Sequence, residues 1–288
     1  MNGSSLYKSP AGQAAVMALY DEALARWPVP CESRRVETRH GATHVLACGD
    51  PAAPPLVLLH GANSNALSWA GDVAEYLQHF RIYAVDVIGE PGRSAPARLP
   101  YAGHAYAEWL SDVLDALPAS RAALVGLSQG GWLALKFASA YPERVTRLVL
   151  LAPGGVVPTR LSFILRAIPL SLLGRRGAEA INRITFGDMS VHPDAVAFMD
   201  AIMTHFRPRI DPEVLFTDEE LRRLCMPILL IAGLRDALRP AGKTAARLQA
   251  VLPQVEIRLL PDAGHVLVGL APQIVPFLLG EETAPGVP

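Results

Sequence analysis

Residues 121–138 read RAALVGLSQGGWLALKFA: an apolar run, a serine between two glycines, and then a helical pattern. A strand that bends sharply into a helix at GLSQG (126–130) would expose Ser128 at the bend. A glycine on each side suits such a bend, because a residue without Cβ lets the two backbones approach closely. This G-x-S-x-G pattern, in a strand–turn–helix context, predicts a nucleophilic serine.

The sequence on both sides of Ser128 alternates between short apolar runs and helical patterns. The strand-like runs are 34–39, 43–49, 56–60, 81–87, 122–127, 145–153, 227–233 and 255–261. The helical patterns are 11–27, 68–80, 104–117, 129–141, 240–251 and about 266–279. Uninterrupted apolar strands between amphipathic helices are typical of a parallel sheet that is buried on both faces. The sequence therefore predicts an α/β fold.

The alternation stops between residues 154 and 220, where helical segments occur without a convincing strand. Because it resumes afterwards, a helical insertion between two strands of one sheet fits better than a separate second domain. We predict an N-terminal helical extension (1–33), an α/β core (34–153 and 221–280) and a helical cap (154–220).

Composition excludes several classes of protein. The chain has 288 residues, 51% hydrophobic and 18% charged, which allows a large core. Its 26 Lys and Arg against 27 Asp and Glu give a net charge of −1, so no nucleic-acid partner is expected. No nucleotide-binding or HExxH motif occurs, and we predict no metal and no cofactor.

The sequence also bears on compartment. Cys31, Cys48 and Cys225 form no CxxC pattern, and buried reduced thiols are expected. The N-terminal stretch shows no signal peptide. The most apolar stretch, 161–174, is too short to span a bilayer. We expect a cytoplasmic protein without a stable membrane anchor, and a homodimer is one option for its assembly.

A serine hydroxyl needs an adjacent base, and a third group must orient that base. His265 lies in LLPDAGHVLVG (259–269), after the last predicted strand, where it would share the sheet edge of Ser128. His60 closes a strand and is expected to be buried against loop backbone. The remaining histidines are expected to be solvated: His40, His44, His79, His104, His192 and His205.

Two carboxylates compete to orient His265. Asp236 follows a predicted strand in LLIAGLRDALRP (229–240), whereas Asp262 stands only three residues before the histidine. We favour Asp236, because Asp262 would more naturally support its own loop. The alternative role for Asp236 is a surface ion pair with Arg235 or Arg239.

Attack on a carbonyl also creates an oxyanion, and each fixed donor for it contributes about 2.7–4 kcal/mol. The N–H of Gln129, which follows the predicted nucleophile, is one expected donor. The loop HGANSN (60–65) is expected to supply the other, from Ala62 in preference to Asn63.

The order Ser128, Asp236, His265, with HGAN upstream and a helical insertion, resembles the α/β-hydrolase superfamily over residues 34 to 279. Within it, the chain is similar to the lid-bearing carboxylesterase and lipase-like branch. The resemblance implies a mostly parallel eight-stranded sheet flanked by helices, an antiparallel first hairpin, and a cap after the sixth strand. It also implies a serine esterase with an acyl-enzyme intermediate. The epoxide hydrolase branch is disfavoured, because its members have aspartate at the position of Ser128.

One departure from this resemblance is visible. Many relatives have D-x-x-G-x-G-x-S after the fourth strand, whereas residues 86–94 read DVIGEPGRS, one residue longer. We expect a structural turn there. The helix at 11–27 lies outside the common core, and the sequence assigns it no role.

Apolar cap residues indicate that the substrate is a small ester with an apolar acyl or alkyl group. The candidate pocket residues are Phe163, Met189, Phe198, Met199, Met203 and Phe206. The same triad could instead hydrolyse a C–C bond, a lactone or a thioester, or catalyse perhydrolysis without a cofactor. A ligand-binding receptor on a hydrolase scaffold is the alternative from another class.

Overall fold

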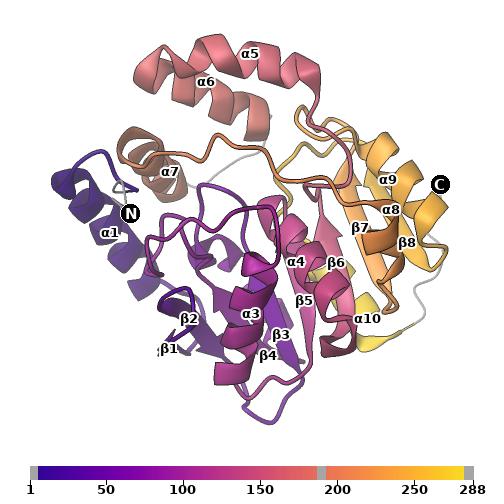
Figure 1. The fold of residues 1–288 in the computed structure, drawn as a ribbon. Helices are drawn as coiled ribbons and strands as arrows, with labels where there is room; N and C mark the ends of the chain where they lie inside the picture. Colours follow the sequence, from indigo (N-terminus) through magenta and orange to yellow (C-terminus); the bar gives the residue numbers. More distant parts are fainter. Residues whose placement is uncertain (1–5, 187–192, 282–288) are drawn as a thin grey trace.

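A computed structural model describes residues 6–186 and 193–281, built around one eight-stranded sheet (Figure 1). Its strands are β1 (Cys31–Val36), β2 (Thr43–Cys48), β3 (Pro55–Leu59), β4 (Arg81–Val85), β5 (Ala122–Leu127), β6 (Val145–Leu151), β7 (Ile228–Gly233) and β8 (Val255–Leu260). Their order across the sheet is β1-β2-β4-β3-β5-β6-β7-β8. Only β2 runs antiparallel to its neighbours β1 and β4, so the predicted sheet and its first hairpin are confirmed.

Helices connect the strands. The α-helices are α1 (Pro10–Ala25), α2 (Val73–Tyr76), α3 (Ala105–Ala116), α4 (Gln129–Ala140), α5 (Leu161–Ser171), α6 (Gly174–Phe186), α7 (Pro193–His205), α8 (Asp218–Arg222), α9 (Ala241–Val251) and α10 (Ala271–Leu279). Two 3₁₀ turns, η1 (Ala66–Trp69) and η2 (Pro142–Arg144), complete the set.

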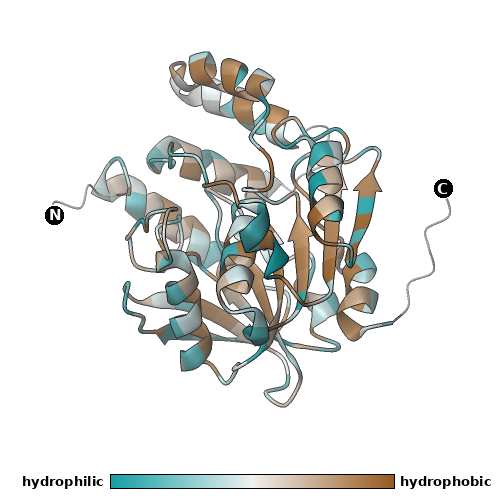
Figure 2. Cartoon of the chain, turned by 45° about the vertical axis from the view of Figure 1, so that its right-hand side comes forward, coloured by the Kyte–Doolittle hydropathy of each residue, from teal (hydrophilic) through white to brown (hydrophobic). Residues whose placement is uncertain are grey.

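Successive residues of the central strands feed two separate cores. Val57 and Leu59 pack with side chains of α3, α4 and α9, whereas Leu56 and Leu58 pack with side chains of η1, α2 and α10. Both faces of the sheet are therefore buried around these strands, which explains why β3, β5 and β7 are apolar at every position rather than at alternate ones. Figure 2 shows the central strands mostly in brown.

Two predicted helices differ from the structure. The pattern at 68–80 divides into η1 and α2, and the last helix starts at Ala271 rather than near 266. Asp72 links the two differences: its buried carboxylate accepts hydrogen bonds from the N–H groups of Gly269, at 3.0 Å, and Ala271, at 2.8 Å. Gly269 lies just before α10 and Ala271 is its first residue, so Asp72 holds the start of the last helix in place.

The segment between β6 and β7 carries helices α5 to α8 and, among its described residues, no strand. Helices α5 and α6 lie above the carboxyl edge of the sheet, and α7 lies beside α1 (Figure 1). Two backbone hydrogen bonds of 2.8 Å join the segment before α1 to the end of α7. The N–H of Lys8 donates to the carbonyl of His205, and the N–H of Arg207 donates to the carbonyl of Leu6. The N-terminal segment, to which the sequence assigns no role, thus supports a helix of the predicted cap.

Candidate active site

Ser128 occupies the bend between β5 and α4 in a backbone conformation that side chains rarely adopt, with φ 53° and ψ −109°. Three hydrogen bonds hold it there. Its N–H donates to the carbonyl of Leu151, at 2.8 Å, and its own carbonyl accepts from the N–H groups of Trp132 and Gly154, both at 3.0 Å. The bend is therefore fixed by β6, by the first turn of α4 and by the start of the cap segment.

The glycines beside Ser128 are required by close backbone contacts. A Cβ at Gly126 would lie 2.4 Å from the carbonyl oxygen of Gly130, and one at Gly130 would lie 2.1 Å from the oxygen of Leu59. No side chain fits at such distances. The elbow thus brings strand and helix together as the G-x-S-x-G pattern predicts.

Three loops bring Ser128, His265 and Asp236 into one hydrogen-bonded line. His265 Nε2 lies 2.9 Å from Ser128 Oγ, and His265 Nδ1 lies 2.7 Å from Asp236 Oδ2. Asp236 and His265 are buried, whereas Ser128 is half-buried and can be reached from solvent. Because a carboxylate only accepts hydrogen bonds, Nδ1 carries the proton, which leaves the Nε2 lone pair facing the serine hydroxyl.

The loop after β7 fixes the orientation of Asp236. Its Oδ1 accepts from the backbone N–H groups of Leu238, at 2.7 Å, and Arg239, at 2.8 Å, so Oδ2 is the oxygen that meets His265. The Arg239 side chain in turn binds Glu213 in an ion pair of 2.5 Å, so Asp236 itself is not its partner. The competing Asp262 is exposed and pairs with Arg235 at 2.5 Å.

His60 is fully buried, as expected, and serves the neighbouring loops. Its Nδ1 donates to the carbonyl of Gly61, at 2.8 Å, and its Nε2 accepts from the N–H of Val87, at 2.9 Å. Burial lowers the pKa of this imidazole, which keeps it neutral. His60 is therefore a structural link between the loops that follow β3 and β4.

The expectation that His44 is solvated is wrong. It is 6% exposed, because β2 lies inside the sheet between β1 and β4. Its Nδ1 lies 3.1 Å from Asp86 Oδ2 and its Nε2 lies 2.5 Å from Ser33 Oγ, which forms a second Ser–His–Asp arrangement. Ser33, however, is exposed on the edge strand β1, away from any strand-to-helix elbow. We assign this cluster a structural role.

Asp86 is the centre of that structural cluster. It is fully buried and accepts hydrogen bonds from the N–H groups of Ala66 and Arg93, both at 2.8 Å, and from the Tyr20 hydroxyl at 3.0 Å. Burial raises the pKa of this carboxyl, but the hydrogen bond and charge of His44 and the two backbone donors outweigh it, so the pKa is lowered. Asp86 thus joins helix α1 to the loops beside the elbow.

The predicted oxyanion donors lie in loops that converge on Ser128. A Cβ at Gly61 would come within 3.6 Å of the Ser128 Cβ, so the loop after β3 passes directly beside the serine. Over the described parts of the chain, the N–H groups of Ala62 and Gln129 have no acceptor. The N–H of Asn63, by contrast, donates to Glu90 Oε2 at 2.8 Å. Of the two alternatives in this loop, Ala62 has the unoccupied N–H.

The candidate pocket residues lie in different surroundings. Phe163 is half-buried on α5, Met199 and Met203 are half-buried on α7, and the ring of Phe198 meets that of Tyr20 at 6.5 Å. Phe206 is buried, with its ring 5.4 Å from that of Tyr7. Met189 lies outside the described residues.

Phe163 and Asp236 share a hollow of about 290 Å³ beneath α5. The other lining residues are Arg160, Ser162, Arg166, Ile184, Leu234, Arg235 and Ala237. Phe163 is therefore placed beside a member of the triad. Leu165 on α5 and Leu172, which follows this helix, are exposed and do not line this hollow.

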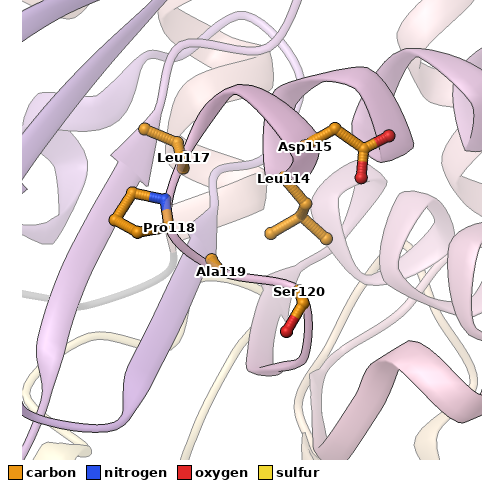
Figure 3. A pocket seen from close by; sticks show the side chains of 6 residues that line it. All are labelled: Leu114, Asp115, Leu117, Pro118, Ala119 and Ser120. Atoms are coloured by element: carbon orange, nitrogen blue, oxygen red, sulfur yellow. The ribbon is translucent and has the colours of Figure 1, made fainter.

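A second hollow, of about 300 Å³, lies far from this chemistry. Figure 3 shows it between α3 and β5, lined by Leu114, Asp115, Leu117, Pro118, Ala119 and Ser120. It opens near the amino end of β5, whereas Ser128 follows the carboxyl end, roughly 20 Å away for a six-residue strand. Asp115 pairs there with Arg144 at 2.8 Å. We assign this hollow no part in the site.

The structure also bears on metal sites, membrane-spanning helices and the three cysteines. Within residues 6–186 and 193–281, no group of side chains is arranged to hold a metal ion. Over the same residues, no helix has the length and apolar character to cross a bilayer. The three cysteines are free, but only Cys48 is buried. The expectation of buried thiols is therefore wrong for Cys31 and Cys225, which are exposed.

Comparisons with known proteins agree with this fold. A family model described as alpha/beta hydrolase fold matches residues 54–180. The uncharacterized carboxylesterase nap of Bacillus subtilis is 37% identical over 86% of this chain and 85% of its own length. The crystal structure of carboxylesterase CesB (YbfK) from the same species covers 94% of this chain and 99% of its own, at 30% identity and a TM-score of 0.84. The crystal structure of naproxen esterase (carboxylesterase NP), also from B. subtilis, covers 95% of this chain and 98% of its own, at 32% identity and a TM-score of 0.84.

The chain belongs to the α/β-hydrolase family, and the predicted fold and family are confirmed. The sequence did not point to one titratable group beside the site, Glu90, whose carboxyl group is close to the Gln129 side chain. The signal for Glu90 in the sequence is the extra residue in the loop 86–94, from which we expect only a structural turn.

Proposed function

We propose that this protein is a serine carboxylesterase, with Ser128 as nucleophile, His265 as general base and Asp236 as the group that orients the histidine. The observation that supports it most directly is the unbroken line of two hydrogen bonds, of 2.9 and 2.7 Å, from Ser128 Oγ through His265 to Asp236. The similarity to Bacillus carboxylesterases along most of the chain favours esters as substrates.

The proposed reaction proceeds in two halves. Ser128 Oγ attacks the ester carbonyl while His265 Nε2 takes its proton, and the imidazolium that forms is stabilised by Asp236. His265 then protonates the leaving alcohol, which leaves an acyl group on Ser128. A water molecule, deprotonated by the same nitrogen, attacks this acyl-enzyme and releases the acid.

The negative charge that develops on the carbonyl oxygen needs donors that are already in place. The N–H groups of Ala62 and Gln129 fit this role, because they flank the serine and have no acceptor within the described residues. Gln129 is also the first residue of α4, where the helix dipole favours negative charge.

The proposed substrate is a small ester with an apolar acyl or alkyl group. Phe163, half-buried next to the Asp236 loop, supports this choice, together with the half-buried methionines of α7. A cytoplasmic location and a homodimer stay predictions, which cell fractionation and light scattering of the purified protein would test.

The proposal is tested with p-nitrophenyl esters and a fluorophosphonate that labels reactive serines. We expect wild-type protein to hydrolyse the esters and to be labelled on Ser128. The Ser128→Ala variant should lose both properties while its thermal unfolding stays nearly unchanged. Labelling elsewhere, or equal turnover by the variant, would refute the assignment of the nucleophile. Binding of an ester without turnover by wild-type protein would favour a receptor.

A further inference from the structure

The loop that follows β4 clamps the loop that holds Ala62. Besides the contact from Glu90 to the Asn63 N–H, the carbonyl of Pro91 accepts from the Asn65 side chain at 3.0 Å. Asp86 adds a third contact, at 2.8 Å, to the N–H of Ala66. The path of residues 60–66 is therefore set by residues 86–91, and Glu90 makes the contact nearest to Ala62.

Glu90 also faces the second half of the proposed oxyanion hole. Its carboxyl group is within hydrogen-bonding reach of the Gln129 side chain, whose Nε2 donates to the Tyr101 hydroxyl at 2.8 Å. Gln129 Oε1 is buried and, as far as the described residues go, has no donor. The contact with the Gln129 side chain lowers the pKa of Glu90, as expected when the amide donates to the carboxyl group.

The surroundings of Glu90 favour its neutral form. The side chain is buried, and burial raises its pKa from the usual 4.5 to about 7, against the opposing effects of Asn63, Gln129 and two cations. Those cations are Arg98, which donates to the carbonyl of Arg207, and Arg209, whose guanidinium lies 3.7 Å from the centre of the Tyr101 ring.

Three tyrosines near Glu90 stay neutral around pH 7, because their pKa values are raised. The charge of Glu90 contributes to raising the pKa of Tyr7, Tyr101 and Tyr106, although burial is the main cause in each case. Glu90 is therefore the carboxyl group in this cluster that changes charge near neutrality.

We propose that Glu90 is a positioning residue that links the two halves of the oxyanion hole and supports catalysis best when it is neutral. This inference rests on the proposed esterase function. Contact with Asn63 fixes the peptide that follows Ala62, and contact with the Gln129 side chain fixes the start of α4. The neutral form keeps the contact with Asn63, because its carbonyl oxygen still accepts from that N–H.

The charge of Glu90 affects the transition state directly. A carboxylate beside the oxyanion hole repels the negative charge that forms on the substrate oxygen, whereas a neutral carboxyl does not. The bound ester is uncharged, so its affinity should be much less sensitive. Ionisation of Glu90 should therefore lower kcat and leave KM nearly unchanged.

The first test compares Glu90→Ala, Glu90→Gln and the control Glu22→Gln, an exposed carboxyl on α1. With a short p-nitrophenyl ester at pH 6, we expect Glu90→Ala to lower kcat about 10- to 100-fold, part of the effect of removing one oxyanion donor. Glu90→Gln should restore most of this loss, because its amide oxygen accepts from the Asn63 N–H as the carboxyl oxygen does in the wild type. Wild-type kcat in Glu90→Ala would overturn the proposal.

The second test remains valid even if Glu90→Ala fails to fold. The ratio of kcat/KM for Glu90→Gln to that for wild type is measured from pH 5 to 9, so that pH effects common to both proteins cancel. We expect the ratio to rise at least about threefold with a midpoint near pH 7, where only wild type acquires the charge. A flat ratio would overturn the proposal. Absence of ester hydrolysis by wild type would refute the proposed function itself.

Discussion

The backbone N–H of Arg239 donates a hydrogen bond of 2.8 Å to Oδ1 of Asp236, three residues before it in the chain. Together with the N–H of Leu238, it occupies the carboxylate oxygen that His265 does not use. The loop that presents Asp236 to the histidine therefore also determines which way its carboxylate faces.

This arrangement makes a sharp prediction for Asp236→Asn. The two backbone donors will hold the amide oxygen at the Oδ1 position, so the NH₂ group must face His265 Nδ1. The histidine can accept from it only as the other tautomer, in which Nε2 carries the proton and cannot take one from Ser128. We expect kcat to fall about 10⁴-fold with KM little changed, measured with a p-nitrophenyl ester.

Asp262→Asn is the matched control for that prediction. Asp262 is exposed and pairs with Arg235, and an exposed ion pair contributes only about 0–1 kcal/mol. Its kcat should stay within about twofold of wild type. If Asp262→Asn were instead the more damaging change, the orienting role would pass to Asp262.

Replacement of Gly130 by alanine tests the close approach at the elbow. The new Cβ would lie 2.1 Å from the carbonyl oxygen of Leu59 and 2.6 Å from that of His60, and both atoms are backbone. Backbone cannot rotate out of the way as a side chain does, so we expect the free energy of unfolding in urea to fall by about 2 kcal/mol or more.

Gly242→Ala provides the comparison for Gly130→Ala. Gly242 lies in α9, and a Cβ there would meet no atom within 4 Å. Alanine is the better helix former, so stability should be unchanged or higher by up to about 1 kcal/mol. Equal stability of the two variants would mean that strand β3 does not press against the elbow as described.

The cap is tested through Phe163. Shortening this side chain to alanine should weaken the selection of long acyl groups, because Phe163 lines the hollow beside Asp236. We expect kcat/KM for p-nitrophenyl octanoate to fall about tenfold relative to that for the acetate, the scale of one lost apolar contact. Leu172→Ala, at a side chain 82% exposed, should leave that ratio unchanged. An equal fall for both esters would assign Phe163 a merely structural role.

Local patterns account for the features that the sequence predicted correctly. The alternation of apolar runs and helices is a property of each segment, and so are the glycines around Ser128 and the position of His265 after the last strand. Parallel strands bring their following loops to one edge of the sheet. That rule was sufficient to predict that Ser128, Asp236 and His265 would lie near one another.

Contacts between distant segments account for what was missed. His44 looked solvated because nothing local shows that Asp86, 42 residues away, meets it inside the sheet. Glu90 looked like part of a turn because its partners, Asn63 and Gln129, come from loops after two other strands. No periodicity in the sequence carries information about such pairs.

The sequence by itself determined the fold family, the strand-to-helix elbow and the residue types available at the carboxyl edge of the sheet. It did so because backbone geometry and the burial of apolar faces follow from local composition. The tertiary structure alone decided that Asp236 rather than Asp262 faces His265, and that Glu90 joins the loops of Ala62 and Gln129. The physical reason is that hydrogen bonds between loops depend on where the whole sheet places them.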